Sequence, residues 1–280
     1  MRRDKYTKNK EIILEYVKSH NVFTLDHIST MLEDLKNQNL VQQSITSDSF
    51  YFKLLEDGLI SYTISLRDIQ KTRYSLNKEF NIYDFASSLE NKSFFPMFTS
   101  LNIQGLSNYR NNFVFISKER KERNNFASRI LTQDAIDKAF ASSPRRTKAH
   151  DVINGYNVVS LESNNTGSIG IIDYNGYKVS SINRALVEII SNIHYFVSPD
   201  NVISEFKAIK DKLNINEIFK IIEKFDFIYP YYQLAGYYLE KIGFTKKELI
   251  KFYSKKSELI FYTIKNKEEY KLDTYWNIKY

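Results

Sequence analysis

The amino-acid sequence predicts an α+β protein with a small N-terminal domain and a larger, mixed C-terminal domain whose second half is mainly helical. Three patterns predict this class: short helical stretches followed by two alternating stretches in residues 1–77, strand-like alternation in the middle of the chain, and a sustained helical period after Ser180. A chain of 280 residues is long enough for about two domains. We therefore expect one domain over residues 1–77 and a second over residues 78–280.

The first domain is expected to begin with three amphipathic helices. Residues 8–20 place their apolar side chains on one helical stripe. Thr24 is a favourable N-cap for a second helix, and Thr46 or Ser47 is a favourable N-cap for a third. The third helix should end at Gly58, because glycine readily takes the left-handed conformation that stops a helix.

Two alternating stretches follow the third helix, at residues 60–66 and 72–76, and they predict a β-hairpin. The order helix, helix, helix, hairpin is typical of a winged helix-turn-helix. Such a domain can place its third helix in the major groove of DNA while the hairpin tip reaches a flanking phosphate. The candidate DNA-binding residues are Ser47, Ser49 and Lys53 on the third helix and Arg67, Lys71 and Arg73 at the hairpin tip.

The charge of the first domain leaves its partner open. Residues 1–77 carry 11 basic and 10 acidic side chains, so the domain is only weakly electropositive. Winged helices also serve as protein-binding domains, and residues 36–45 make a longer connection than the tight turn of a helix-turn-helix. Protein contacts therefore stand as an alternative to DNA, which is the partner we favour.

The middle of the chain should mix helix and strand. Asn175-Gly176 is a strong signal for a two-residue hairpin turn. The expected elements are a helical region at residues 77–105 and strands at 112–118, 155–161, 168–173 and 177–180.

A basic run follows the expected strand at residues 112–118. Residues 78–160 carry 12 basic and 8 acidic side chains, the largest positive excess along the chain. If the run flanks DNA, its cations should neutralise phosphates. An ordinary solvated surface is the alternative, because Glu119 and Glu122 interrupt the run. The basic residues of the run are Lys118, Arg120, Lys121 and Arg123.

Helical periodicity dominates the second half of the chain, which is expected to form a helical bundle. A strand pair is expected at the end, over residues 259–264 and 270–278. The expected helices include residues 185–190, 202–206, 218–225, 231–242 and 245–254.

Residue types with catalytic or metal-binding chemistry do not gather in the sequence. The chain has no cysteine, its 4 histidines stand far apart, and its 8 glycines form no phosphate-binding loop. We therefore expect no catalytic residue, no metal and no cofactor, and so no enzyme activity. The lack of cysteine favours a reducing compartment, and no apolar run approaches the roughly 18 residues of a membrane helix. We expect a cytoplasmic protein with no membrane partner.

Four short stretches are similar to a known family: KLLEDGLI (53–60), SLNIQGL (100–106), YKVSSINRALVE (177–188) and YPYYQLAGYYLE (229–240). Together with the order of the domains, they resemble the AbiEi-type antitoxins and transcriptional regulators of abortive-infection toxin–antitoxin systems. The chain departs from that family at Asn183, where relatives tend to have an acid, and at Tyr232, where they often have histidine. The antitoxin-motif residues are Arg184, Tyr229, Pro230, Tyr231, Gln233, Gly236 and Tyr238.

The resemblance implies a repressor that binds inverted repeats in its own promoter, as double-stranded DNA, through the winged helix. It also implies that the C-terminal domain counteracts a nucleotidyltransferase-like toxin without forming a stable complex with it. A stand-alone regulator that senses a ligand is the alternative, and a DNA-processing enzyme is a less favoured one. Residues 229–238 also fit the start of a buried helix with Pro230 at its first position, so these residues either support the fold or recognise a partner.

Overall fold

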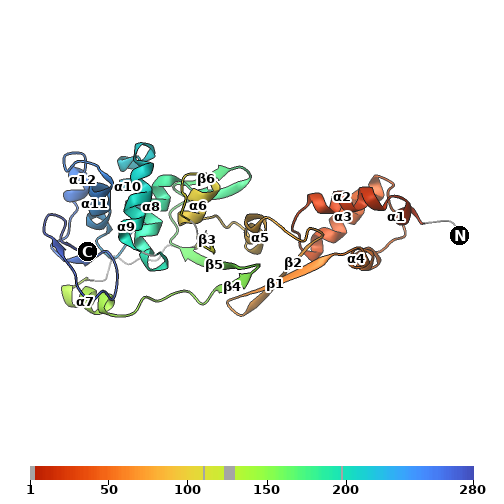
Figure 1. Ribbon diagram of the computed structural model, residues 1–280, viewed down its shortest axis with the longest axis horizontal. Coiled ribbons are helices and arrows are strands. Elements are labelled where there is room, and N and C mark those ends of the chain that lie inside the picture. The colour runs from red at the N-terminus through yellow and green to blue at the C-terminus, as the bar shows by residue number, and fades with distance from the viewer. Residues whose placement is uncertain (1–3, 110, 123–129, 197) are drawn as a thin grey trace. The chain divides into compact units, whose positions relative to one another are not determined.

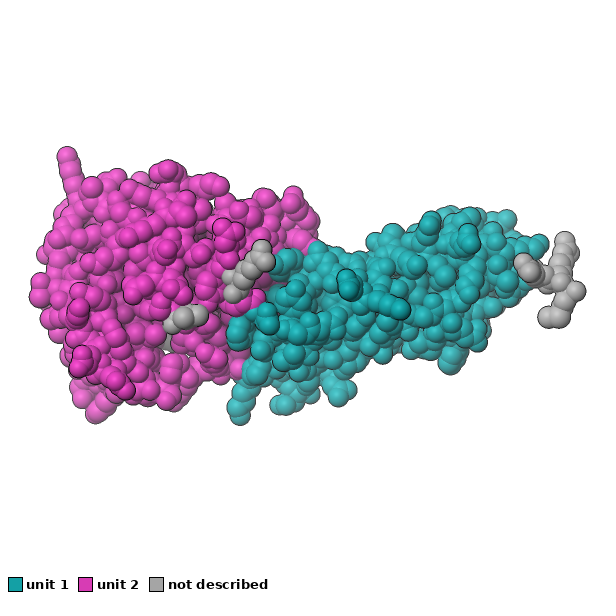
Figure 2. Space-filling view, viewed as in Figure 1, with its two compact units in different colours: residues 1–92, 112–114, 148–159 teal, residues 93–111, 115–147, 160–280 magenta. Residues whose placement is uncertain are grey.

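The computed structural model describes residues 4–109, 111–122, 130–196 and 198–280, and the protein is α+β. The chain divides into two compact units, coloured teal and magenta in Figure 2. Unit 1 contains residues 1–92, 112–114 and 148–159, and unit 2 contains residues 93–111, 115–147 and 160–280. Unit 1 therefore includes segments beyond residue 77, where the sequence places the domain boundary.

Unit 1 begins with helices, which are followed by a hairpin. Two of these helices begin at the expected N-cap residues. Thr24 is the N-cap of the third helix of the chain and Thr46 of the fourth, where the Thr46 hydroxyl accepts a hydrogen bond from the Ser49 backbone. The elements are α1 (Lys5–Lys8), α2 (Lys10–Ser19), α3 (Leu25–Asn37), α4 (Ser47–Glu56), β1 (Ile60–Leu66), β2 (Ile69–Ser75) and, further along, α5 (Ile82–Leu89) and β4 (His150–Ile153).

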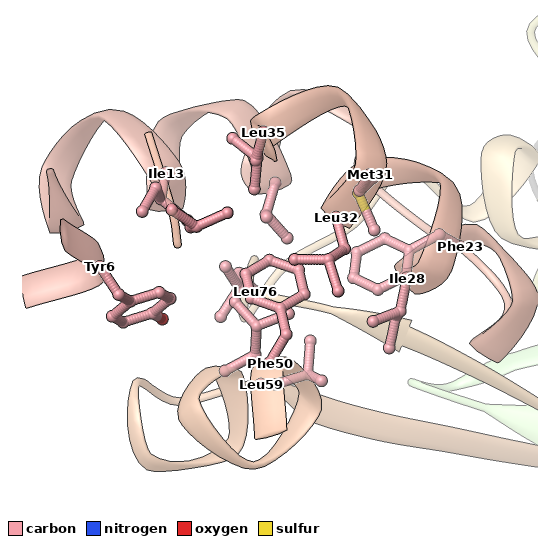
Figure 3. Packing of buried hydrophobic residues seen from close by; sticks show 13 residues of the cluster. Tyr6, Ile13, Phe23, Ile28, Met31, Leu32, Leu35, Phe50, Leu59 and Leu76 are labelled. Atoms are coloured by element: carbon pink, nitrogen blue, oxygen red, sulfur yellow. The ribbon is translucent and has the colours of Figure 1, made fainter. Parts of the chain in front are cut away.

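The core of unit 1 lies between α2, α3, α4 and the base of the hairpin (Figure 3). Leu35 and Phe50 are completely buried there, and Tyr6 of α1 covers one end of the cluster. The cluster consists of Tyr6, Ile13, Val17, Phe23, Ile28, Met31, Leu32, Leu35, Val41, Phe50, Leu54, Leu59 and Leu76.

The hairpin of β1 and β2 is antiparallel and tightly closed. Ile60 pairs with Ser75 at its base and Leu66 pairs with Ile69 next to the turn. The turn residues Arg67 and Asp68 have φ angles of 54° and 62°. Two consecutive left-handed residues are the geometry of a type I′ turn, whose twist matches that of the paired strands.

Three further sheets are small. β3 (Phe113–Glu119), β5 (Tyr156–Ser163) and β4 form a sheet of order β3-β5-β4, and β6 (Ile171–Tyr174) pairs with β7 (Tyr177–Ser180). Asn175 and Gly176 make the expected turn between β6 and β7, both with positive φ. Near the C-terminus, β10 (Ile278–Lys279) lies parallel to β8 (Phe261–Tyr262) and antiparallel to β9 (Leu272–Asp273).

Unit 2 is built around α8, which is buried along residues 183–190 and is contacted by α6, α10 and α11 (Figure 1). The sequence predicted the later helices but neither α7 nor β4. The helices of unit 2 are α6 (Met97–Ile103), α7 (Gln133–Ala141), α8 (Ile182–Ser191), α9 (Pro199–Ala208), α10 (Ile215–Phe225), α11 (Tyr231–Ile242) and α12 (Ile250–Tyr253), with 3-10 turns η1 (Ile193–Tyr195) and η2 (Lys210–Lys212).

Within the described residues, no helix combines the length and the apolar character needed to cross a membrane. In the same ranges, no three metal-binding side chains gather into a cluster.

Candidate functional site

Helix α4 presents its N-terminal turn to solvent. Phe50 anchors the opposite side of the helix in the core. Ser49 is exposed, and its backbone nitrogen donates to the Thr46 hydroxyl at 3.2 Å. Ser47 is half-buried, and its hydroxyl accepts a hydrogen bond from Ser29 of α3 at 3.1 Å. The structure thus brings two predicted hydroxyl groups to a helix N-terminus, where backbone N–H groups and the helix dipole favour an anion such as phosphate.

Lys53, the third candidate on α4, is engaged within unit 1. Its Nζ lies 3.1 Å from the carboxylate of Asp4 and 4.9 Å from the centre of the Tyr6 ring. Hydrogen bonds from Thr7, and then Lys53, lower the pKa of Asp4 to about 2, so this carboxylate is charged at neutral pH. Lys53 would have to leave this ion pair to read a base.

The structure corrects the predicted positions of Lys71 and Arg73, which do not lie at the hairpin tip. The turn is only two residues long, so β2 already includes both side chains. Lys71 donates to the carbonyl of Leu89 at 2.6 Å, and Arg73 Nε donates to the hydroxyl of Ser88 at 2.9 Å. Burial lowers the pKa of Arg73. Both cations therefore hold the C-terminal end of α5, where unpaired carbonyls attract positive charge, and Arg67 is the predicted basic residue that lies in the turn.

The basic run after β3 has mixed roles. Lys118 belongs to β3, and Arg120 forms an ion pair with Glu162 at 3.5 Å. Lys121 is exposed, and its carbonyl accepts a hydrogen bond from Asn165. Arg123 lies outside the described residues.

Arg184, the motif residue on α8, is completely buried inside unit 2. Its Nε donates to Glu188 at 2.6 Å, and its Nη1 donates to Glu119 at 3.0 Å and to the carbonyl of Ile169 at 2.7 Å. Glu188 also accepts a hydrogen bond from the hydroxyl of Ser180 at 2.7 Å. One buried cation thus joins β3, α8 and the loop before β6.

Glu119 remains ionised in this network although it is partly buried. Burial raises its pKa, but hydrogen bonds from Thr166 and Ser168 and the charge of Arg184 together lower it below its ordinary value. The hydroxyl of Thr166 also accepts a hydrogen bond from Arg184 at 3.0 Å. These contacts give Glu119 a structural partner, so it does not act only as an acid that interrupts a basic run.

The motif residues on α11 mostly hold the C-terminal segment in place. Gln233 is completely buried; its amide donates to the carbonyl of Leu259 at 2.9 Å and accepts from the backbone nitrogen of Ser257 at 2.9 Å. Gly236 lies directly against Trp276, and a Cβ atom there would come within 2.8 Å of three atoms of the indole ring. The lack of a side chain at position 236 therefore leaves the space that the indole ring fills.

Pro230 is the N-cap of α11, so its prediction as the first helical residue is wrong by one position. The backbone nitrogen of Tyr231 donates to the carbonyl of Tyr229 at 2.8 Å, and Pro230 has φ −76° and ψ 65°. This geometry is an inverse γ-turn, which delays the helix by one residue.

The tyrosines of the motif are held inside unit 2. Tyr238 is completely buried, and burial raises its pKa well above the ordinary value. Tyr229 and Tyr231 contact the ring of Phe261.

The two departures from the family also have structural partners. Asn183 is buried, and its side-chain oxygen accepts a hydrogen bond from the backbone nitrogen of Asn214, the N-cap of α10. Tyr232 packs against Phe219 with ring centres 4.8 Å apart. Both side chains therefore join helices of unit 2.

The sequence identified Arg184 but missed the carboxylates that bind it. Glu188 lies four residues further along the same helix, a spacing at which oppositely charged side chains pair, so this partner was visible in the sequence. Glu119 is 65 residues away, and no local pattern indicates that contact.

The fold has a distant likeness among solved structures. A crystal structure of the Rv2827c protein from Mycobacterium tuberculosis matches 98% of this chain and 91% of its own, with a TM-score of 0.57 and 11% sequence identity. At this identity the likeness concerns the fold alone. No protein-family model matches the sequence, and no curated protein matches it.

Proposed function

We propose that the protein is an antitoxin that binds its own promoter DNA as a transcriptional repressor and counteracts a nucleotidyltransferase-like toxin. The observation that supports DNA binding is the arrangement of unit 1. Helices α2, α3 and α4 enclose one core and lead into a hairpin with a basic turn residue, and α4 leaves Ser49 exposed at its N-terminal end. This order is typical of a winged helix-turn-helix, whose recognition helix contacts DNA through its N-terminal residues, and it supports the proposal.

The antitoxin half of the proposal is supported by the family resemblance. The motif residues Arg184, Gln233 and Tyr238 are completely buried, so their contribution to that activity is to hold the C-terminal half in its folded form. A toxin would then meet the surface that this scaffold positions. The proposal requires no stable complex between the two proteins.

Replacing Ser49 with Glu is expected to weaken binding to the promoter fragment by about tenfold or more. The new carboxylate would repel phosphate at the α4 N-terminus. Folding should not suffer, because Thr46 and Glu at position 49 form a capping box. Fluorescence anisotropy with a labelled promoter duplex measures the affinity, where tenfold is about 1.4 kcal/mol.

Ala135→Glu is the matched control for this charge. Thr132 is the N-cap of α7 and its hydroxyl accepts from the backbone of Ala135, so the variant builds the same capping box with the same charge in unit 2. It should bind the promoter like the wild type. Equal affinity of Ser49→Glu and wild type would reject α4 as the DNA-binding helix, and both variants should still relieve growth arrest by the cognate toxin.

Asp48→Asn should have the opposite effect on DNA binding. Asp48 is exposed in the first turn of α4, where its charge opposes that of the phosphates. Removing that charge should strengthen promoter binding several-fold and preserve the shape of the side chain. Titrations over a series of salt concentrations should show the gain mainly at low salt, because the effect is electrostatic. An unchanged or weaker affinity at low salt would place the phosphates elsewhere.

A further inference from the structure

A cavity of about 230 Å³ lies within unit 2, between the end of α7, the end of α8 with η1, the start of α11 and the segment around β8. Its volume is slightly below the roughly 300 Å³ at which small-molecule pockets usually begin, so it suits one planar ring system rather than a large ligand. The aromatic residues that line it are Phe140, Tyr229, Tyr231, Phe261 and Tyr262.

The aromatic rings already form an ordered set. Phe140 is stacked on Tyr262 with ring centres 5.0 Å apart and planes at 14°, and Tyr229 is stacked on Phe261 at 5.4 Å and 27°. Phe140 also meets Phe261 edge to face at 4.8 Å. Because these rings hold one another in place, the cavity is lined by pre-arranged aromatic side chains that a planar aromatic group can contact.

The charged groups at this cavity are all basic. Arg145 and Lys265 line it together with His194, and among the residues that the structure describes no aspartate or glutamate does. Within the described residues, neither Arg145 nor Lys265 forms an ion pair; Lys265 Nζ lies 5.4 Å from the centre of the Phe140 ring. The carboxylate of Asp137, which accepts from the Tyr262 hydroxyl at 2.8 Å, does not line the cavity.

The directions in which the pKa values of the basic groups shift agree with an excess of positive charge. Burial and the charge of Arg145 lower the pKa of Lys265. Burial, followed by the charges of Arg146 and Lys265, lowers the pKa of His194 to about 4, so this histidine is neutral at pH 7. A bound anion would relieve the repulsion between the cations.

We propose that this cavity binds a nucleotide, with the base against the aromatic walls and the phosphate at Arg145 and Lys265. Stacking on aromatic rings is how proteins hold nucleobases, and cations without a protein counter-ion are suited to phosphate. Tyr229 and Tyr231, two residues of the antitoxin motif, then gain a ligand-binding role in addition to their packing. The inference does not depend on promoter binding, because all of its residues belong to unit 2.

Binding of AMP to the full-length protein tests the proposal, with adenosine and inorganic phosphate as separate probes. AMP should bind more tightly than either fragment, since each fragment occupies only half of the site. A 2-aminopurine nucleoside monophosphate should lose fluorescence on binding as its base stacks. A short 5′-phosphorylated oligonucleotide distinguishes a free nucleotide from the end of a nucleic-acid strand as the ligand. Binding of the oligonucleotide without binding of AMP would identify the strand end.

The variants Lys265→Met and Arg145→Gln should each weaken binding by about tenfold, which is the expected scale for losing a charge-assisted contact. Lys267→Met is the matched control, because Lys267 is exposed two residues away and does not line the cavity. Arg145 is exposed, so its replacement should leave folding intact. The proposal is overturned if neither AMP nor the oligonucleotide shows saturable binding, if inorganic phosphate binds as tightly as AMP, or if both cavity variants bind like Lys267→Met.

Discussion

Replacing Arg184 with Met should lower the free energy of unfolding of unit 2 by about 3 to 5 kcal/mol, the usual cost of removing one partner from a buried ion pair. The guanidinium has no exposed surface, and it is bound to the carboxylates of Glu119 and Glu188. Methionine fills part of the space but leaves both carboxylates without their cation. Urea unfolding followed by fluorescence measures the loss, because the only tryptophan, Trp276, is buried in unit 2.

Two further variants separate the ion pair from simple loss of volume. Lys207→Met also replaces a cation with methionine, but at an exposed position of α9, and should cost less than about 0.5 kcal/mol. Adding Glu188→Gln to Arg184→Met should recover part of the stability, since one unpaired carboxylate is removed. If the double variant is no more stable than Arg184→Met, the lost stability comes from packing and not from the buried charges.

The same network predicts a pH dependence. The pKa of Glu119 is lowered in the folded protein, so its contribution to stability is present above its unfolded pKa, near 4.3, and is lost as the pH falls through the lower folded value. Without Arg184, one of the causes that lower the pKa of Glu119 in the folded protein is absent, so the folded and unfolded pKa values of Glu119 lie closer together. The decline of stability between pH 5 and pH 3 should therefore be shallower in Arg184→Met than in the wild type. A steeper decline would contradict the assigned role of Glu119.

Local signals in the sequence predicted local structure well. Thr24 and Thr46 marked helix starts because an N-cap hydroxyl acts on the turn that follows it, and Asn175-Gly176 marked the β6–β7 turn because both residues tolerate positive φ. Arg67-Asp68 lacks that signature. The hairpin tip was therefore predicted too long, and Lys71 and Arg73 were placed on it by mistake.

Contacts between segments far apart in the chain could not be predicted from the sequence. Helix α7 has only Ile136 and Phe140 buried, too few for a visible period, and Phe140 is fixed by rings of β8 more than 100 residues later. The buried partners of Arg184 and the basic, aromatic cavity depend on the same kind of long-range packing. The sequence could supply Arg184, Tyr229 and Tyr231 as residues of interest, but only the fold shows what each of them contacts.

Replacing Gly236 with Ala should destabilise unit 2 by about 2 kcal/mol, although alanine favours a helix over glycine by about 1 kcal/mol. The added Cβ would come within 2.8 Å of Cε3 of Trp276 and closer to two further ring atoms, distances that force the indole or α11 to move. Trp276 is completely buried, and overpacking a filled core costs roughly 1 to 3 kcal/mol or more. The steric clash with the buried ring therefore outweighs the gain in helix propensity.

A double-mutant cycle with Trp276→Phe decides whether that contact is the cause. Phenylalanine is smaller than tryptophan, so Gly236→Ala should cost less in the Trp276→Phe background than in the wild type. Thermal unfolding followed by circular dichroism serves all four proteins, because Trp276→Phe removes the fluorescent probe. Trp276→Phe alone should also destabilise, since it leaves a void and removes the hydrogen bond from the indole nitrogen to Glu240. If Gly236→Ala costs the same free energy of unfolding in both backgrounds, the two residues act independently. A contact other than that with Trp276 would then require glycine at position 236.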